Sequence, residues 1–548
     1  MKTIIISALA VFTPAISFAC TSLIAAKGAT KDGSVLVTYA ADSHSLFGEL
    51  YNQPAADHKP GTMRKVVEWD TGRPLGEIPE VPHTFKTLGN MNEHGLVIAE
   101  STWGGRHELL DTTGIIDYGS LIYITLQRAT NAREAIKIMT DLVNEYGYAS
   151  EGESFSIADP DEVWIMDLIG KGSKEKGAVW VARRVPDGYI AGHANQPRIH
   201  TFPLNDPNGE TIYSPDVISF AREMGYYDGS DEDFSFSLTY NPVDFGTLRG
   251  CDARIWAYFN KYASGIDQYL PWINQAADPI MPLWVKPDSL LDANDLKWMM
   301  RDHYENTPFD MTQDIGAGPF RVPYRWRPMN FKVEGEEYFH ERAIATQQTG
   351  FSFVARLKDD LPEGAKGLLW FGTDDANTCV YMPVYCSVDS VPFQIAQGNG
   401  DMNTISWDSN FWVNNYVANQ AYNRYSQMIP DIRKVQANLE NGAEMAVMEF
   451  EKNASQMTPQ QIAQETQRMA DYWAKKSTED YKTLGDFLLV KFMDGNIKKQ
   501  NDDGSFKTNG YGLPANPNYG GYDDQRYFKS IADETGDRLK VKEVKREK

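Results

Sequence analysis

Residues 20–43 read CTSLIAAKGATKDGSVLVTYAADS, two apolar runs on either side of a turn signal. The runs Ser22–Ala26 and Val35–Tyr39 have the length and apolar content of β-strands, and the Lys31-Asp32-Gly33 sequence between them is typical of a tight turn. The stretch therefore predicts a β-hairpin whose first strand begins directly after Cys20.

Similar patterns follow as far as residue 390. Residues 84–103 form a second strand–turn–strand pattern, and further strands are predicted at 155–157, 163–168, 178–184, 188–193, 351–357, 367–372 and 378–384. Helices are predicted over 120–145, 252–263 and 289–303. Hairpins with helices between them favour an α+β fold built of layers over alternating βαβ winding.

Beyond about residue 400 the pattern becomes helical. Helices are predicted over 411–450 and 459–477, and Thr458-Pro459-Gln460-Gln461 opens the second with an N-cap, a proline at the first helical position and a capping-box glutamine. Residues 500–525 are rich in Gly, Asn, Asp and Tyr, which predicts a loop. We therefore expect one domain over residues 20–390 and a mainly helical C-terminal extension over 391–548.

Composition excludes several classes of protein. With 548 residues, 42% apolar and 23% charged, the chain is globular and too long for a single small core. The net charge of −22 would repel a phosphate backbone, so nucleic-acid binding is not expected. No apolar run reaches the roughly 18 residues that a transmembrane segment needs.

Residues 1–19 have the pattern of a signal peptide. Lys2 precedes the apolar stretch Ile4–Ile16, and Ser17-Phe18-Ala19 places small residues at positions −3 and −1 of a cleavage site. Cleavage there would make Cys20 the mature N-terminus of an exported, periplasmic or secreted, protein. A lipoprotein signal would also place a cysteine first, but such signals usually carry Leu at −3 and a small residue at −2, so lipid anchoring is the less favoured alternative.

The chain has four cysteines, too few for a disulfide scaffold. Cys379 and Cys386 either pair or remain free thiols, while Cys251 has no obvious partner except Cys20. The nine histidines are dispersed, and His107-Glu108 lacks the second histidine of a zinc helix. No metal and no cofactor are therefore expected.

An N-terminal cysteine has chemistry of its own. The α-amine, with a pKa of about 7.7–8.0, lies beside a thiol with a pKa of about 8.5, so a proton passes between them at little cost. Such a residue can act as a nucleophile without a separate histidine base.

Several ordered motifs resemble those of a known family. Cys20-Thr21-Ser22 is followed by the Lys31-Asp32-Gly33 turn and by Asp42, nine residues after Gly33. Three more motifs follow in order: Met91-Asn92-Glu93-His94-Gly95-Leu96, Ala194-Asn195-Gln196-Pro197-Arg198-Ile199-His200 and Asp252-Ala253-Arg254-Ile255. Over residues 20–390 this set resembles the cysteine dipeptidase family (dipeptidase A type), a branch of the N-terminal-nucleophile (Ntn) hydrolases related to penicillin V acylases and bile salt hydrolases.

The resemblance implies a four-layer αββα Ntn-hydrolase fold and a role for each matched residue. Cys20 would be the nucleophile, and Asp42 would orient its α-amine. Asn195 and the backbone N–H at Thr102 would form an oxyanion hole. Arg254 would supply positive charge near the thiolate or the substrate carboxylate.

One residue departs from the family pattern. The family commonly has an arginine three residues before the aspartate, in contact with the nucleophilic sulfur, and this chain has Tyr39 there. The departure removes one positive charge that would lower the thiol pKa. Tyr39 is therefore expected at the substrate site with a different hydrogen-bonding role, or another cation serves.

The resemblance implies an exported dipeptidase that acts on short peptides. An acylase that cuts a non-peptide amide, such as a bile salt or penicillin side chain, is an alternative, although Tyr118-Gly119-Ser120-Leu121 and Gly152-Glu153-Ser154-Phe155 match the dipeptidases. A surface lipoprotein that serves as a binding module is the alternative without catalysis. Short peptides are the expected partners, and assembly into a homo-oligomer is left open.

Overall fold

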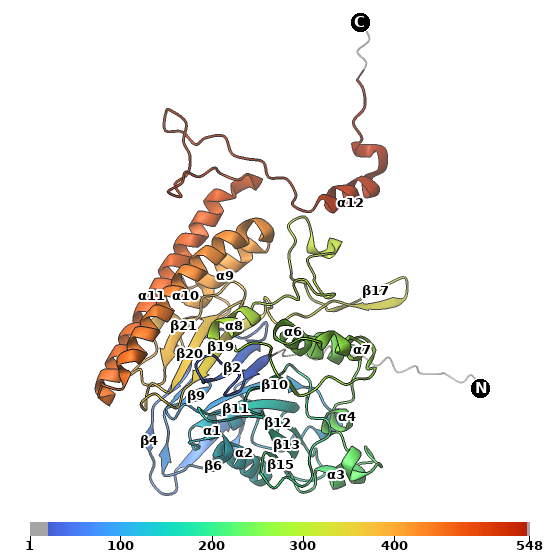
Figure 1. The fold of residues 1–548 in the computed structure, drawn as a ribbon, viewed down its shortest axis with the longest axis vertical. Helices are drawn as coiled ribbons and strands as arrows, with labels where there is room; N and C mark the ends of the chain where they lie inside the picture. The colour runs from blue at the N-terminus through green and yellow to red at the C-terminus, as the bar shows by residue number, and fades with distance from the viewer. Residues whose placement is uncertain (1–19, 545–548) are drawn as a thin grey trace, which may run out of the picture.

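The computed structural model describes residues 20–544 (Figure 1). The predicted signal peptide, residues 1–19, lies outside the described residues. Antiparallel sheets and helices are mixed along the chain, and the C-terminal region is helical. The structure therefore confirms the α+β class.

A seven-stranded antiparallel sheet contains the predicted hairpin. β1 (Ser22–Ala25) pairs with β2 (Val35–Asp42), and β19 (Thr349–Leu357) pairs along the other edge of β2. The strand that follows Cys20 thus lies in the middle of the sheet. The order is β16-β14-β1-β2-β19-β20-β21, with β14 (Ile190–His193), β16 (Trp284–Val285), β20 (Gly367–Thr373) and β21 (Met382–Tyr385).

A second antiparallel sheet has eight strands. The predicted turn over residues 91–95 leads into β10 (Val97–Trp103), which carries Thr102 near its end. The order is β15-β13-β12-β11-β10-β9-β8-β3, with β3 (Asn52–Gln53), β8 (Thr87–Leu88), β9 (Met91–Asn92), β11 (Gly152–Ala158), β12 (Val163–Gly170), β13 (Ala178–Arg184) and β15 (Thr211–Tyr213).

The two sheets face each other through β1 and β2 on one side and β10 and β11 on the other. A buried polar cluster joins them: Ser22 Oγ lies 2.8 Å from Ser156 Oγ, and the ring of His193 is hydrogen-bonded to Ser156 and Ser101. Burial lowers the pKa of His193 to about 3, so the neutral ring offers one donor and one acceptor to these hydroxyls.

Helices pack against both sheets (Figure 1). Alternate residues of β10 belong to different cores: Val97 and Ala99 to the one shared with the seven-stranded sheet, and Ile98 to one shared with helices. The helices on the eight-stranded sheet are α1 (Tyr118–Leu126), α2 (Ala132–Tyr146) and α3 (Val217–Glu223). Those on the seven-stranded sheet are α6 (Ala253–Tyr262), α8 (Ala293–Met299), α9 (Asn410–Ala421), α10 (Tyr425–Ala454) and α11 (Pro459–Lys491).

Several predicted helices have other bounds. The helix predicted over 120–145 is two helices, because Asn131 caps α2 by accepting from the Glu134 N–H. The helix predicted over 411–450 is also two, since the backbone of Arg424 is not helical. The Thr458 and Gln461 capping box is present, but α11 runs fourteen residues beyond the predicted end at 477, to Lys491. Among the helices of residues 20–544, none has the length and hydropathy to cross a membrane.

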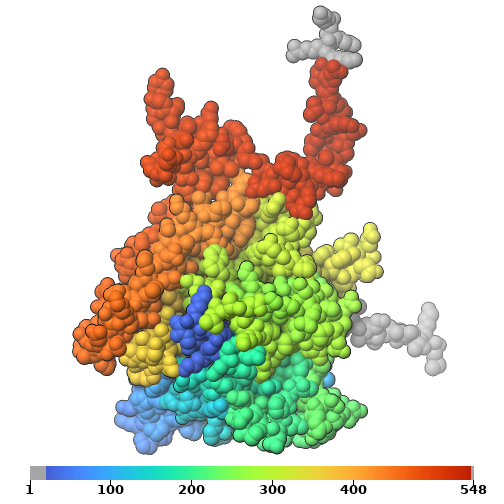
Figure 2. All heavy atoms as spheres, viewed as in Figure 1, coloured from blue at the N-terminus to red at the C-terminus, as the bar shows by residue number. Residues whose placement is uncertain are grey.

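Small elements complete the structure. The segment after α11 extends beyond the sheets and includes the predicted loop over 500–525 (Figures 1 and 2). Three two-stranded pairs lie elsewhere: β4 (Ala56–Asp57) with β7 (His83–Thr84), β5 (Met63–Val67) with β6 (Pro74–Pro79), and β17 (Asn330–Val333) with β18 (Glu336–Phe339). The remaining α-helices are α4 (Phe236–Tyr240), α5 (Phe245–Thr247), α7 (Leu270–Gln275) and α12 (Gln525–Thr535), and Leu248–Asp252 forms a π-helical turn.

Candidate active site

The hairpin β1–β2 brings three predicted site residues together. Thr21 and Ala40 exchange backbone hydrogen bonds of 3.3 and 3.0 Å, which fix Cys20 beside β2. Cys20 is 4% exposed, and its Sγ lies 3.8 Å from the hydroxyl oxygen of Tyr39. Asp42 stands at the end of the same strand and is also buried. One strand thus carries both side chains that flank the thiol.

Arg254 joins the Cys20 segment to the Asn195 segment. Its Nη1 donates to the carbonyl oxygen of Cys20 at 2.7 Å and to Thr21 Oγ1 at 2.8 Å. Its Nη2 donates to Asn195 Oδ1 at 2.7 Å and to the Ala194 carbonyl at 3.2 Å, and its Nε donates to the Gly250 carbonyl at 2.8 Å. These five bonds use all five N–H groups of the guanidinium. Arg254 therefore holds backbone and side-chain oxygens around Cys20.

Asn195 and Thr102 are brought together from the two sheets. Asn195 follows β14 with a φ of 57°, a left-handed conformation that asparagine tolerates better than most residues. Its Nδ2 donates to the Thr102 carbonyl at 2.5 Å. Thr102 Oγ1 in turn donates to Glu153 at 3.0 Å. The residues expected to form an oxyanion hole are therefore in direct contact.

The Asp42 carboxylate is held by residues from distant parts of the chain. Arg342 donates to Asp42 Oδ2 at 2.5 Å, and Thr349 Oγ1 donates to Oδ1 at 2.6 Å. Burial raises the pKa of Asp42, while the positive charge of Arg342 opposes that shift. The structure thus places a cation beside Asp42 that no local motif had indicated.

Tyr39 connects the thiol to a pair of buried carboxyl groups. Its hydroxyl donates to Glu100, which is 1% exposed. Glu153 neighbours Glu100, and the pKa of Glu153 is raised by burial and then by the Glu100 charge. The pKa of Cys20 is likewise raised, first by burial and then by the charges of Glu100 and Asp42, while hydrogen bonds with the Asp42 backbone and Tyr39 lower it. The surroundings of Cys20 therefore favour the neutral thiol.

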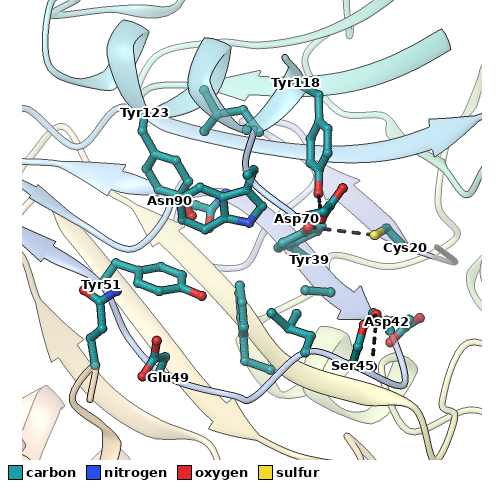
Figure 3. Close-up of a pocket in the computed structure, with 18 of the residues that line it drawn as sticks. Cys20, Tyr39, Asp42, Ser45, Glu49, Tyr51, Asp70, Asn90, Tyr118 and Tyr123 are labelled. Carbon is teal, nitrogen blue, oxygen red and sulfur yellow. Dashed lines mark hydrogen bonds between the residues drawn. The ribbon is translucent and has the colours of Figure 1, made fainter. Parts of the chain in front are cut away.

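A cavity of about 290 Å³ opens beside Cys20 (Figure 3). Tyr39 and Asp42 line it near the sulfur, and Glu49, Asp70 and a group of aromatic rings form the rest of its wall. Gln397 is the one lining residue from the described part of the region after residue 390, so the helices α9–α11 do not surround this cavity.

A second hollow of about 380 Å³ lies beside Arg254. Thr102, Asn195 and Arg254 line it, together with Arg327 and Arg342. The predicted site residues are thus divided between two hollows, an acidic one beside the thiol and one rich in arginine. Within residues 20–544 no group of three or more His, Cys, Asp or Glu side chains is arranged to hold a metal ion.

Three residues of this site were not found by sequence reasoning: Glu100, Asp70 and Arg342. Glu153 lies in a segment that the sequence analysis quoted, but it had been given no role. Glu100 had a usable signal, because it is a charged residue within the apolar strand Val97–Trp103, and such residues are rarely buried without a specific partner. Asp70 and Arg342 lie in polar segments and have no such signal. The four cysteines of the chain are all free thiols, so neither Cys379–Cys386 nor Cys20–Cys251 is bonded.

Comparison with known proteins identifies the family. The model of peptidase family C69 matches residues 19–438. Among curated proteins, a probable dipeptidase of Latilactobacillus sakei is 23% identical over 68% of this chain and 75% of its own length. A probable dipeptidase A of Streptococcus pyogenes serotype M1 is 23% identical over 83% of this chain and 93% of its own length. A dipeptidase of Bifidobacterium longum is 24% identical over 73% of this chain and 76% of its own length. Since the family model covers most of the chain and includes every residue of the site, the chain belongs to peptidase family C69.

Proposed function

We propose that this protein is an exported dipeptidase whose nucleophile is Cys20, exposed when residues 1–19 are removed. The observation that carries the proposal is the position of Cys20: its thiol lies on the wall of a cavity, and Arg254 ties its carbonyl oxygen to Asn195. Family membership and the names of the relatives support the same activity.

The proposed reaction is amide hydrolysis in two steps. The free α-amine of Cys20 takes the thiol proton, the thiolate attacks the carbonyl carbon, and the amine returns the proton to the departing nitrogen. A thioester to Cys20 results, and the same amine then activates the water that hydrolyses it. Asn195 Nδ2 and the Thr102 N–H would stabilise the oxyanion, and loss of one such donor reduces rates by roughly 10²–10³.

The arrangement of layers supports an Ntn-hydrolase fold for this chain. Two antiparallel sheets face each other, and helices pack on both, as a four-layer αββα structure requires. We propose this fold because it places the residue that becomes the N-terminus at the start of a central strand pair.

The size of the cavity favours very short substrates. At about 290 Å³ it lies at the lower end of the roughly 300–1,000 Å³ range of ligand sites. One residue on the acyl side of the scissile bond fits such a volume better than a longer chain does. We therefore expect kcat/KM to fall at least about tenfold, or 1.4 kcal/mol, when a residue is added before the first residue of a dipeptide substrate.

A panel assay on the processed protein tests the proposal. Dipeptides, their tripeptide and tetrapeptide extensions, penicillin V and a bile salt would be compared, with Cys20→Ser as the control for adventitious peptidases. Intact mass would establish whether Cys20 is the unmodified N-terminus. Hydrolysis of the tetrapeptide at the dipeptide rate, or of penicillin V or the bile salt instead of dipeptides, would contradict the dipeptidase assignment. Acylation of Cys20 without catalysis would indicate a lipoprotein.

A further inference from the structure

The cavity beside Cys20 offers hydrogen-bond acceptors. Asn90 is 2% exposed; its Nδ2 donates to the Ile98 carbonyl at 2.8 Å, but its Oδ1 is buried without a hydrogen-bond partner. Asp70 and Glu49 add carboxylates to the same wall (Figure 3). A buried acceptor without a partner is unfavourable by about 1–3 kcal/mol. The cavity is therefore suited to a ligand that brings donors.

The charge of the wall is negative. Among the described residues that line the cavity, none is Lys, Arg or His. Arg342, which does not line the cavity, balances the negative charge of Asp42 through an ion pair. Glu49 accepts a hydrogen bond from the backbone N–H of Gly398 at 2.8 Å. Asp70 at the mouth accepts from the Tyr118 hydroxyl at 2.8 Å, a neutral partner that leaves the carboxylate charge uncompensated.

Aromatic rings form the apolar part of the wall. The rings of Trp69 and Tyr123 are stacked with centroids 4.4 Å apart, and Tyr51 meets Trp69 edge-on at 5.0 Å. Gly119 permits this packing, since a Cβ there would lie 2.4 Å from Trp69 Cβ. The wall is thus a preformed apolar surface beside the carboxylates.

We propose that this cavity binds the first residue of the substrate, with Asp70 holding its free ammonium group and the aromatic wall holding its side chain. The assignment rests on the proposed dipeptidase function and names the substrate class: dipeptides with an unblocked N-terminus and a large apolar first side chain. The ammonium nitrogen of such a peptide is two bonds, about 2.5 Å, from the scissile carbonyl carbon. Its partner must therefore lie in the same cavity as the nucleophile, as Asp70 does.

The bound ammonium would also add a positive charge to a cavity whose described lining has no Lys, Arg or His. The group nearest the thiol on this wall is the neutral Tyr39, whose hydroxyl oxygen lies 3.8 Å from Cys20 Sγ and donates to the Glu100 carboxylate. An ammonium held between Asp70 and Cys20 adds a second positive charge near the developing thiolate, beside the protonated Cys20 α-amine, only when the correct substrate is bound. Recognition of the N-terminus and activation of the nucleophile are then the same event.

The test compares substrates that differ only in the ammonium group. Phe-Ala, 3-phenylpropanoyl-Ala and N-acetyl-Phe-Ala would be assayed with the wild-type enzyme, with Asp70→Asn and with Glu77→Gln. Asn keeps an acceptor for the Tyr118 hydroxyl, so folding is not at risk, and Glu77 is an exposed carboxylate on β6 outside the cavity lining. A charged hydrogen bond of about 2 kcal/mol corresponds to a roughly 30-fold effect.

Wild-type and Glu77→Gln enzymes are expected to prefer Phe-Ala at least about 30-fold in kcat/KM over both other compounds. Asp70→Asn should lose most of that preference through a lower rate on Phe-Ala, with an unchanged rate on 3-phenylpropanoyl-Ala. Equal wild-type rates on the three compounds, or an equal loss on all three in Asp70→Asn, would overturn the ammonium site and leave the dipeptidase function standing. Failure of the wild type to cleave any peptide would overturn both.

Discussion

Replacement of Arg254 by lysine would test whether the guanidinium network builds the active site. The arginine is 1% exposed and makes five hydrogen bonds, with the Cys20, Ala194 and Gly250 carbonyls, Thr21 and Asn195. A lysine ammonium keeps the charge but has three donors and no planar fork, so at least two of the bonds are lost.

The expected effect follows from the number of bonds. Bonds that involve a charged group contribute about 1.5–3 kcal/mol each, so the free energy of unfolding should fall by about 3–6 kcal/mol. This is a large part of a total stability of about 5–15 kcal/mol, but the protein should still fold. Because Asn195 and Cys20 lose their common anchor, kcat should fall by about 10²–10³ with a smaller change in KM.

Urea unfolding followed by tryptophan fluorescence would measure the stability, and steady-state hydrolysis of a dipeptide would measure kcat and KM. Arg249→Lys is the matched control, since Arg249 is half-buried on the same segment and contacts Asn274 and Glu341; about 1 kcal/mol or less is expected there. An Arg254→Lys enzyme with unfolding free energy within about 1 kcal/mol of wild type and an unchanged kcat would refute the reasoning.

Three further predictions concern Cys20 and the cavity beside it. Cys20→Ala should fold as the wild type does and have no activity. A chain that keeps residues 1–19 should also be inactive, because its Cys20 nitrogen is an amide. Hydrolysis of a dipeptide by either protein would exclude the proposed mechanism. Tyr39→Phe removes a hydrogen bond that lowers the Cys20 pKa, so the pH profile of inactivation by iodoacetamide should move to higher pH. An unmoved profile would assign Tyr39 to packing. Partial burial, followed by the nearby charges of Glu100, Asp117 and Glu68, raises the pKa of Asp70 to about 6. The Asp70 carboxylate loses its charge below that pH, so the preference for Phe-Ala over 3-phenylpropanoyl-Ala should decline as the pH falls below 6. A preference independent of pH would argue against Asp70 as the ammonium partner.

Features that depend on residues close to one another in sequence could be predicted. The β1–β2 hairpin follows from apolar runs and the Lys31-Asp32-Gly33 turn, and the start of α11 follows from its capping box. Local hydrogen bonding and burial decide both features. The resemblance also named residues that lie together in the structure, such as Asn195, Arg254 and Thr102; their catalytic roles remain proposals.

The partners of those residues were not predictable from local pattern. Asp42 was expected to orient the α-amine, yet the contacts that hold its carboxylate come from Arg342 and Thr349, about three hundred residues away. The predicted helix bounds were wrong for a related reason. Residues 120–145 have continuous apolar periodicity, and only the cap at Asn131 divides them into two helices. Contacts between residues far apart in the chain cannot be predicted from the spacing of neighbouring residues.

The position of β2 between β1 and β19 has a consequence for the order of events during synthesis. The residues that complete one edge of β2 begin at Thr349, so in a growing chain Cys20 lies beside an incompletely paired β2 until more than 300 further residues have been made. Closing so long a connection is entropically unfavourable, and contacts of this separation form slowly. Arg342, which pairs with Asp42, is made in the same late interval. A nascent or truncated chain therefore lacks the contacts that assemble the candidate site, and we expect the newly made peptidase to be inactive on peptides around it until its own sheet has closed.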